Sequence, residues 1–130
     1  MCNKIHEENR PIKETGFGWK IFRSWADDRG KIKSCFNNDV YDKTNGIIKW
    51  DPRFDYIGDG FCFFILKSEA MKALKSMEKG NFTDRRRYIR RITYSKGLVR
   101  QMESKMIIGT VEIALCKEWR FTSDQKRYRV

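Results

Sequence analysis

The chain of 130 residues is poor in the side chains from which most catalytic and metal centres are built. It has one histidine, His6, in a polar N-terminal stretch, and its four cysteines (Cys2, Cys35, Cys62 and Cys116) lie far apart. No pair of them has the C-x-x-C spacing of a zinc site or a redox pair. A Ser-His-Asp or Cys-His site is disfavoured because the one histidine lies in that N-terminal stretch. The sequence therefore predicts no metal site, no cofactor, and free thiols in a reducing cytosol.

Long apolar runs and phosphate-binding loops are also missing. The most apolar segment, Phe61–Leu66, is far shorter than the roughly 20 residues of a membrane-spanning helix. Residues 1–13 have no hydrophobic region of the signal-peptide kind. We therefore expect a cytoplasmic protein with no membrane partner. Neither a G-x-x-x-x-G-K loop nor a G-x-G-x-x-G fingerprint occurs.

Positive charge is what the chain has in excess. Its 28 Lys and Arg against 17 Asp and Glu give a formal net charge of +11. Between Arg85 and Lys105 there are eight basic residues and one acid, Glu103, a local balance of 8 − 1 = +7. Such a block indicates an anionic partner, without identifying it.

The remaining composition is that of a folded domain. Hydrophobic residues make up 40% of the chain and aromatic residues 14%, enough for a packed core. We predict a single α+β domain over residues 16–122, with a twisted, mainly antiparallel sheet and one main helix. Residues 1–15 read as a polar tail or edge segment, and residues 123–130 as a basic tail.

Alternating apolar residues predict several strands. A hairpin is expected from residues 19–23 and 31–36, and a short strand near Trp50. Residues 61–66 are expected to form a central strand buried on both faces. Ser68 as N-cap and Gly80 as C-cap predict a helix over about residues 69–79. The last strands are expected at residues 88–94, 98–102 and 111–116, with a turn at Gly97.

The basic block carries aromatic rings between its arginines. Guanidinium groups bind phosphate through two parallel hydrogen bonds, and exposed rings stack on bases. The sequence therefore predicts a site for an anionic, nucleotide-like ligand or for nucleic acid. A solvated basic edge strand that discourages aggregation is the alternative. The predicted site consists of Lys20, Arg23, Phe82, Arg85, Arg86, Arg87, Tyr88, Arg90, Arg91, Tyr94 and Arg100.

The register of the strand at residues 88–94 decides which of these side chains face a ligand. If Ile89 faces the core, then Tyr88, Arg90 and Tyr94 are expected on the exposed face. If Ile92 faces the core, then Arg91 and Arg87 are expected there instead. The alternation alone leaves both registers open.

The order of short motifs resembles that of a group of small phage and prophage proteins of uncharacterised function. The motifs are GFGWKIF at residues 16–22, the region of Trp50, GFCFF at residues 60–64 before a helix with Glu69 and Ala70, and a basic strand pair ending near Trp119. In that group the middle motif usually reads Gly-Phe-His-x-Phe, and Cys62 stands here in place of the histidine. The resemblance implies a phage-type accessory protein, with an anti-defence role among those it allows, in the host cytoplasm.

A more distant likeness is to ADP-ribosyltransferase-like folds, which cradle NAD between two small sheets. The segment from Gly60 to Ala70 is similar to their central motif. This likeness implies Glu112 as the catalytic residue, whereas Lys20 and Arg23 only approximate the His or Arg of the family's first strand.

Four functions follow from these observations. The leading one is non-enzymatic binding of a nucleotide-like ligand, such as a nucleotide immune signal. The alternatives are binding of DNA or RNA through the basic strand, docking on a host defence protein as an inhibitor, and an NAD-using, ADP-ribosyltransferase-like activity. A homodimer or higher homo-oligomer is compatible with each, because small domains often build pockets between subunits.

Overall fold

A computed structural model describes residues 10–24, 31–34, 40–42, 46–50, 60–79, 86–103 and 111–130. These residues form a small α+β-like domain, in which a mostly antiparallel sheet is accompanied by one helix. The elements are β1 (Arg10–Pro11), β2 (Gly16–Ser24), β3 (Lys31–Ser34), β4 (Val40–Asp42), β5 (Ile48–Lys49), β6 (Phe61–Phe63), α1 (Lys67–Lys79), β7 (Arg86–Glu103) and β8 (Val111–Phe121).

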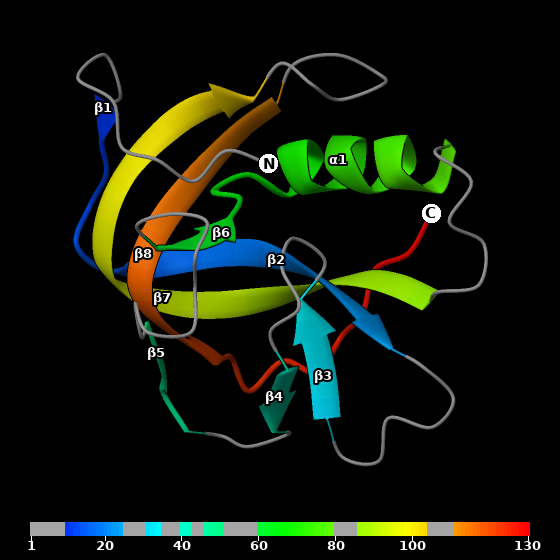
Figure 1. Cartoon of the computed structure of the whole chain (residues 1–130), viewed down its shortest axis with the longest axis horizontal. Coiled ribbons are helices and arrows are strands. Elements are labelled where there is room, and N and C mark those ends of the chain that lie inside the picture. Colours follow the sequence, from blue (N-terminus) through cyan, green and yellow to red (C-terminus); the bar gives the residue numbers. More distant parts are fainter. Residues whose placement is uncertain are drawn as a thin grey trace.

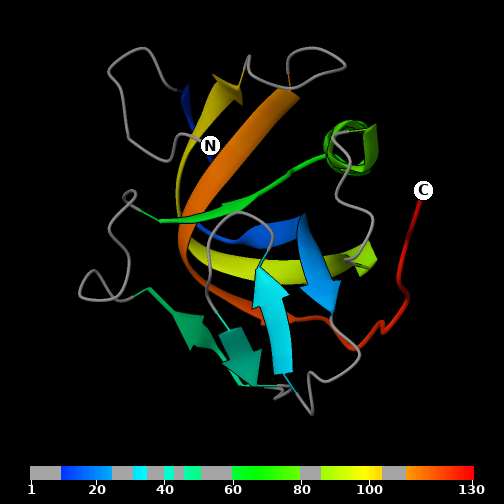
Figure 2. The ribbon, with the colours of Figure 1, turned by 45° about the vertical axis from the view of Figure 1, so that its right-hand side comes forward.

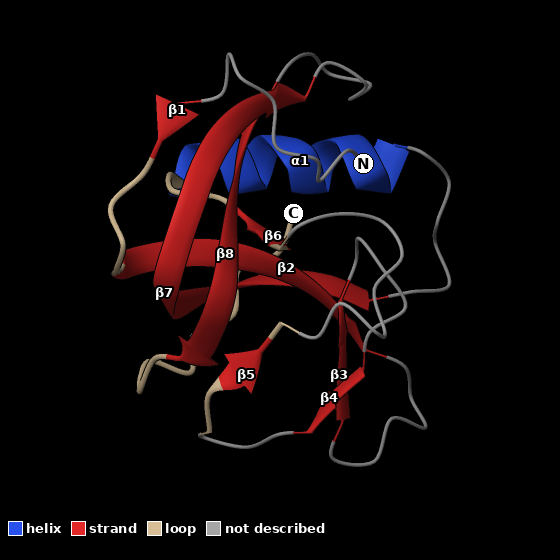
Figure 3. Ribbon diagram, turned by 60° about the vertical axis from the view of Figure 1, so that its left-hand side comes forward, coloured by secondary structure: helices blue, strands red, loops and turns tan. Residues whose placement is uncertain are grey.

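The sheet is organised around β7 and β8. The main strand order is β4-β3-β2-β7-β8-β5, with β1 paired to β7 and β6 paired to β8, and all pairs are antiparallel. β7 and β8 run side by side and curve strongly (Figure 1). Helix α1 lies at one end of the molecule and the β3–β4 hairpin at the opposite end, as the turned views also show (Figures 2 and 3). The predicted hairpin between β2 and β3 is confirmed.

Helix α1 packs through a narrow apolar face. Ala70, Ala73 and Leu74 follow the i, i+3, i+4 spacing and are fully buried against β2, β7 and β8. The helix begins at Lys67, so Ser68 lies in its first turn rather than at the predicted N-cap. The carboxylate of Glu69 accepts a hydrogen bond from the backbone N–H of Glu112 (3.1 Å), which ties the start of the helix to β8. The predicted cap at Gly80 lies outside the described residues.

Both faces of the β2–β7 pair contribute buried residues to the core, so the expectation that only one face of β7 joins it is wrong. Tyr88 and Phe22 belong to an aromatic cluster, whereas Ile89 and Ile21 belong to an aliphatic cluster under α1. Successive strand residues point to opposite faces, so each of these neighbours lies on a different side of the sheet. Because the sheet curves, the aromatic side chains on one face pack against one another. Helix α1 covers the other face.

Strand β7 continues through Gly97, where the sequence predicts a turn. Pairing with β8 shifts register between Gly97 and Arg100, which marks a β-bulge inside one 18-residue strand. Lys96, just before it, has a positive φ of 53°. The backbone N–H of Gly97 donates to the carbonyl oxygen of Glu14 (2.9 Å). The glycine therefore bends the strand and admits the segment before β2, rather than ending the strand.

Strand β6 is shorter than predicted but is buried as expected. Residues 61–64 are buried on both sides, whereas Leu66 is 50% exposed because the chain turns there into α1. β6 pairs with β8, and Phe64 just after it forms an isolated bridge to Trp19 of β2 through two 2.7 Å backbone hydrogen bonds. Cys62 and Cys116, the two cysteines in the described part of the chain, are buried and neither forms a disulfide there. Over the described residues, no helix has the length and apolarity that crossing a membrane requires.

Candidate ligand-binding site

Four residues of the predicted site are buried rather than lying on an exposed surface: Lys20, Arg87, Tyr88 and Tyr94. Lys20 is 1% exposed, and its ammonium group donates to the carbonyl oxygen of Cys62 (2.7 Å). Arg87 is buried and pairs with Glu78 of α1 at 3.9 Å. Tyr88 is buried against Phe22, with ring centres 5.9 Å apart. These side chains are covered because both faces of the strand pair are packed.

Four other predicted residues lie partly or wholly outside the described part of the chain. Phe82 and Arg85 fall in such a segment. Arg23 and Arg86 have described backbones, and they pair in register with Arg87 and Ser24 across the β2–β7 ladder. Their side chains lie outside the described set.

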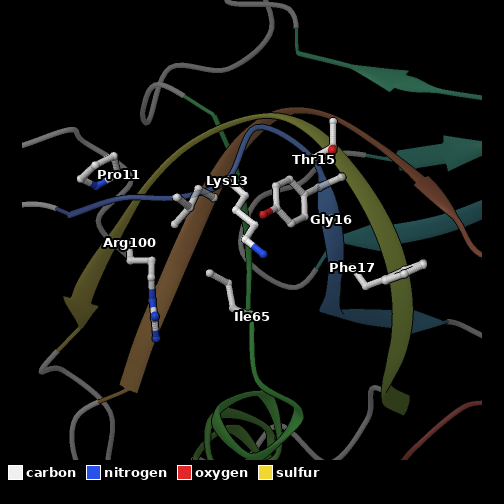
Figure 4. A pocket seen from close by; sticks show the side chains of 9 residues that line it. Pro11, Lys13, Thr15, Gly16, Phe17, Ile65 and Arg100 are labelled. Atoms are coloured by element: carbon white, nitrogen blue, oxygen red, sulfur yellow. The ribbon is translucent and has the colours of Figure 1, made fainter.

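Tyr94 and Arg100 lie together at a pocket of about 530 Å³, which we call the Tyr94 pocket. That volume is within the range of small-molecule sites. The pocket lies between the residues that follow β1, the start of β2, and β7 (Figure 4). Its lining consists of Pro11, Ile12, Lys13, Thr15, Gly16, Phe17, Ile65, Tyr94 and Arg100.

Tyr94 forms the inner wall of this pocket. Its ring packs on Phe63 with centres 4.7 Å apart, and its cross-strand partner is Gly16. A Cβ on Gly16 would lie 3.1 Å from the Tyr94 hydroxyl, so the missing side chain leaves room for the ring. Burial raises the pKa of Tyr94, and the Cys116 thiol adds to this rise. The phenol is therefore a neutral hydrogen-bonding group at physiological pH.

Two cations line the pocket, and none of its lining residues is acidic. The Lys13 side chain lies between Arg100 and Phe17, above Ile65 (Figure 4). Arg100 also forms an ion pair with Glu112 of β8, and that carboxylate is shared with Arg10 of β1. Counting Arg10, Lys13 and Arg100 against Glu112 gives a local charge of 3 − 1 = +2.

The position of Glu112 bears on the ADP-ribosyltransferase likeness. One carboxylate oxygen pairs with Arg10 and the other with Arg100. The residue therefore holds β1 and β7 together through its charge. In this arrangement it links β1 and β7 beside the pocket.

A cation–aromatic surface adjoins the pocket. The guanidinium of Arg91 lies 4.1 Å from the centre of the Phe17 ring and 6.0 Å from that of Trp19. Trp19 in turn meets Tyr128 edge-on at 5.6 Å, and the ammonium of Lys67 lies 3.4 Å from the Tyr128 ring centre. Phe17 is 58% exposed and also lines the pocket, so it joins the two features.

Sequence reasoning missed Lys13, Thr15 and Phe17 as site residues. Lys13 and Thr15 lie in the segment assigned to a tail or edge, and contact with β7 places them at the pocket. Phe17 carried a usable signal, because a ring between Gly16 and Gly18 at the start of a strand is unusually accessible.

The described residues hold no cluster of three His, Cys, Asp or Glu side chains able to bind a metal ion. No protein-family model, curated protein or solved structure matches this chain.

Proposed function

We propose that this protein binds an anionic, nucleotide-like ligand in the Tyr94 pocket without transforming it. The observation that best supports this proposal is that Lys13 and Arg100 line the same cavity as the neutral phenol of Tyr94 and the exposed ring of Phe17. Cations suit the phosphate groups of such a ligand. Apolar and aromatic walls suit its base, because ring stacking contributes roughly 1–3 kcal/mol per base.

The test is calorimetric titration with a panel of mononucleotides, cyclic oligonucleotides and NAD-derived ligands. For the ligand that binds, Lys13→Gln is expected to weaken affinity at least about tenfold, because a hydrogen bond to a charged group contributes about 1.5–3 kcal/mol. Tyr94→Phe is expected to weaken it less, since the ring remains.

The matched control is Lys75→Gln, which removes the same charge from an exposed position on α1. It is expected to leave affinity unchanged within about twofold. Equal losses in Lys13→Gln and Lys75→Gln would show that overall charge, not the pocket, carries binding.

Binding of single-stranded nucleic acid is the second candidate, and the stacked Arg91, Phe17 and Trp19 side chains favour it. A labelled oligonucleotide titrated across a salt series distinguishes the two. Binding along the surface predicts a slope of several released counterions and a smaller slope for Arg91→Gln. Binding of one small ligand in the pocket predicts a shallow slope that Arg91→Gln changes little.

The biological setting we propose is that of a phage-type accessory protein that sequesters a nucleotide immune signal. Sequestration requires only affinity and abundance, which suits a small chain whose described residues hold no catalytic constellation. Docking on a host defence protein through the basic face is a separate proposal. A pull-down in which excess nucleotide does not compete would favour docking.

A further inference from the structure

A second, smaller cavity lies at the end of β8, on the far side of Ile92 from the Tyr94 pocket along β7. Its volume is about 280 Å³, below the usual range for small-molecule sites, and we call it the Arg90 pocket. None of its lining residues lines the Tyr94 pocket. They are Arg90, Arg120, Phe121, Thr122, Ser123 and Gln125.

Arg90 is held in place before any ligand arrives. Its guanidinium carbon lies 4.0 Å from the centre of the Phe121 ring, so the planar group stacks on a buried aromatic side chain. Its Nε atom is buried and has no hydrogen-bond partner among the described residues. A buried donor without a partner is costly, because its hydration is lost without replacement.

The surroundings of Arg90 are positively charged. Arg120 lines the same cavity and is exposed. Burial lowers the pKa of Arg90, and repulsion from Arg127 lowers it further, whereas Tyr88 and Asp124 act in the opposite direction. The Asp124 carboxylate accepts a hydrogen bond from the backbone N–H of Lys126 (2.9 Å) and does not line the cavity.

The rim of the cavity is fixed to β7. The Thr122 hydroxyl donates to the carbonyl oxygen of Arg91 (3.3 Å), which holds the segment after β8 beside Arg90. Ser123 and Gln125 follow in the same segment and supply a hydroxyl and an amide to the lining. The cavity thus combines two guanidinium groups with neutral hydrogen-bonding groups in a space suited to one small anion.

We propose that the Arg90 pocket binds a terminal phosphate group, with the rest of the ligand outside the cavity. A guanidinium that presents two N–H groups side by side matches two phosphate oxygens. A terminal phosphate has three free oxygens and about two negative charges, whereas a phosphodiester has two free oxygens and one charge. The paired arginines and the adjacent hydroxyl and amide suit the former. This site stands independently of the function proposed for the Tyr94 pocket.

The test follows the arginine Nε–Hε resonances of ¹⁵N-labelled protein during titration with inorganic phosphate. A saturable shift of the Arg90 resonance is expected. Arg90→Lys keeps the charge but loses the two-pronged donor, and is expected to weaken phosphate affinity at least about tenfold, a change of about 1.4 kcal/mol. Loss of affinity is measured by the shifts of backbone amides around Ser123, which remain visible in every variant.

Arg129→Lys is the matched control, because it makes the same chemical change outside the cavity and is expected to alter affinity less than about twofold. Arg120→Gln changes an exposed side chain, so it preserves the core and is also expected to weaken binding. Unchanged affinity in both Arg90→Lys and Arg120→Gln would overturn the site. Thermal midpoints of all variants identify any that have lost the fold.

Dimethyl phosphate distinguishes the two kinds of phosphate. We expect it to bind at least about tenfold more weakly than inorganic phosphate. Equal affinity for the two probes would overturn the assignment to a terminal phosphate and leave a site for nucleic-acid backbone instead. A shift of all surface arginines together, without saturation at Arg90, would show that no built site exists.

Discussion

A Cβ atom added to Gly97 would lie 2.2 Å from the carbonyl oxygen of Lys13. The middle of β7 and the segment before β2 therefore touch backbone to backbone. Two hydrogen bonds fix this contact, from Gly97 to Glu14 (2.9 Å) and from Ile12 to Leu98 (3.3 Å). The front wall of the Tyr94 pocket depends on it, because Ile12 and Lys13 line that wall.

Gly97→Ala is therefore expected to displace residues 12–14 and open the Tyr94 pocket. Because the clash is with backbone, we expect a loss of about 1–3 kcal/mol in the free energy of unfolding, together with weaker ligand binding. Gly16→Ala is the comparison, since its Cβ would meet the Tyr94 ring at a milder 3.1 Å. Urea unfolding measures both. An equally stable Gly97→Ala protein with unchanged binding would refute the close contact.

Phe63→Ala is expected to destabilise the domain by about 3–5 kcal/mol. The Phe63 ring is fully buried between β6 and Tyr94, so truncation leaves a cavity in the aromatic cluster. Phe17→Ala removes the same ring from a largely exposed position and is expected to cost less than about 0.5 kcal/mol. Similar losses for the two variants, measured by urea unfolding, would contradict the burial that distinguishes them.

Glu112→Gln tests whether this residue is structural or catalytic. Removing the carboxylate leaves Arg10 and Arg100 close together without their shared partner. A loss of stability of about 1 kcal/mol is expected, because the pairs are partly solvated. We expect no NAD consumption by either protein. If the parent protein consumes NAD and Glu112→Gln does not, the residue is catalytic and the proposed binding function is wrong.

Stability is expected to fall above pH 9 because of Cys116. Burial raises the pKa of its thiol to about 12 against an ordinary value of 9.0, although Lys20 opposes the rise. The folded state therefore keeps the thiol proton where the unfolded state loses it. The free energy of unfolding is unaffected below about pH 9 and decreases between pH 9 and 12, by up to about 1.4 kcal/mol per pH unit.

The raised pKa of Tyr94 adds a decrease of the same sign, which begins near the ordinary tyrosine value of 10.0 and so overlaps the Cys116 range. Cys116→Ala is expected to reduce the slope of unfolding free energy against pH between 9 and 11. Urea titrations at several pH values check this. An identical slope in the variant would assign the alkaline loss to other groups.

The sequence pattern correctly predicted the helix and strands that are determined by residues close together in the chain. The alternation around Trp19–Phe22 predicted β2, and the apolar spacing from Ala70 to Leu74 predicted α1. The turn predicted at Gly97 was wrong because the role of this residue depends on contacts with Lys13 and Glu14, which are distant in sequence. A single amino-acid sequence does not distinguish a glycine at a β-bulge from a glycine at a turn.

The candidate site was predicted only in part, for a related reason. Alternation in β7 suggested one buried and one exposed face, but the curvature of the sheet, together with α1, buries both. Tyr88 and Arg87 consequently became core residues, whereas Arg91 remained partly accessible beside Phe17. Which arginine reaches solvent depends on what covers each face, and a single strand's sequence does not encode that.

Strand β7 carries a residue of each pocket, Arg90 and Tyr94, four positions apart. The strand rise places their Cα atoms about 13 Å apart. Hydrogen bonding to β2 on one side, and to β8 and Tyr128 on the other, keeps that separation from changing. A ligand that engaged both pockets at once would need anionic groups at a matching interval.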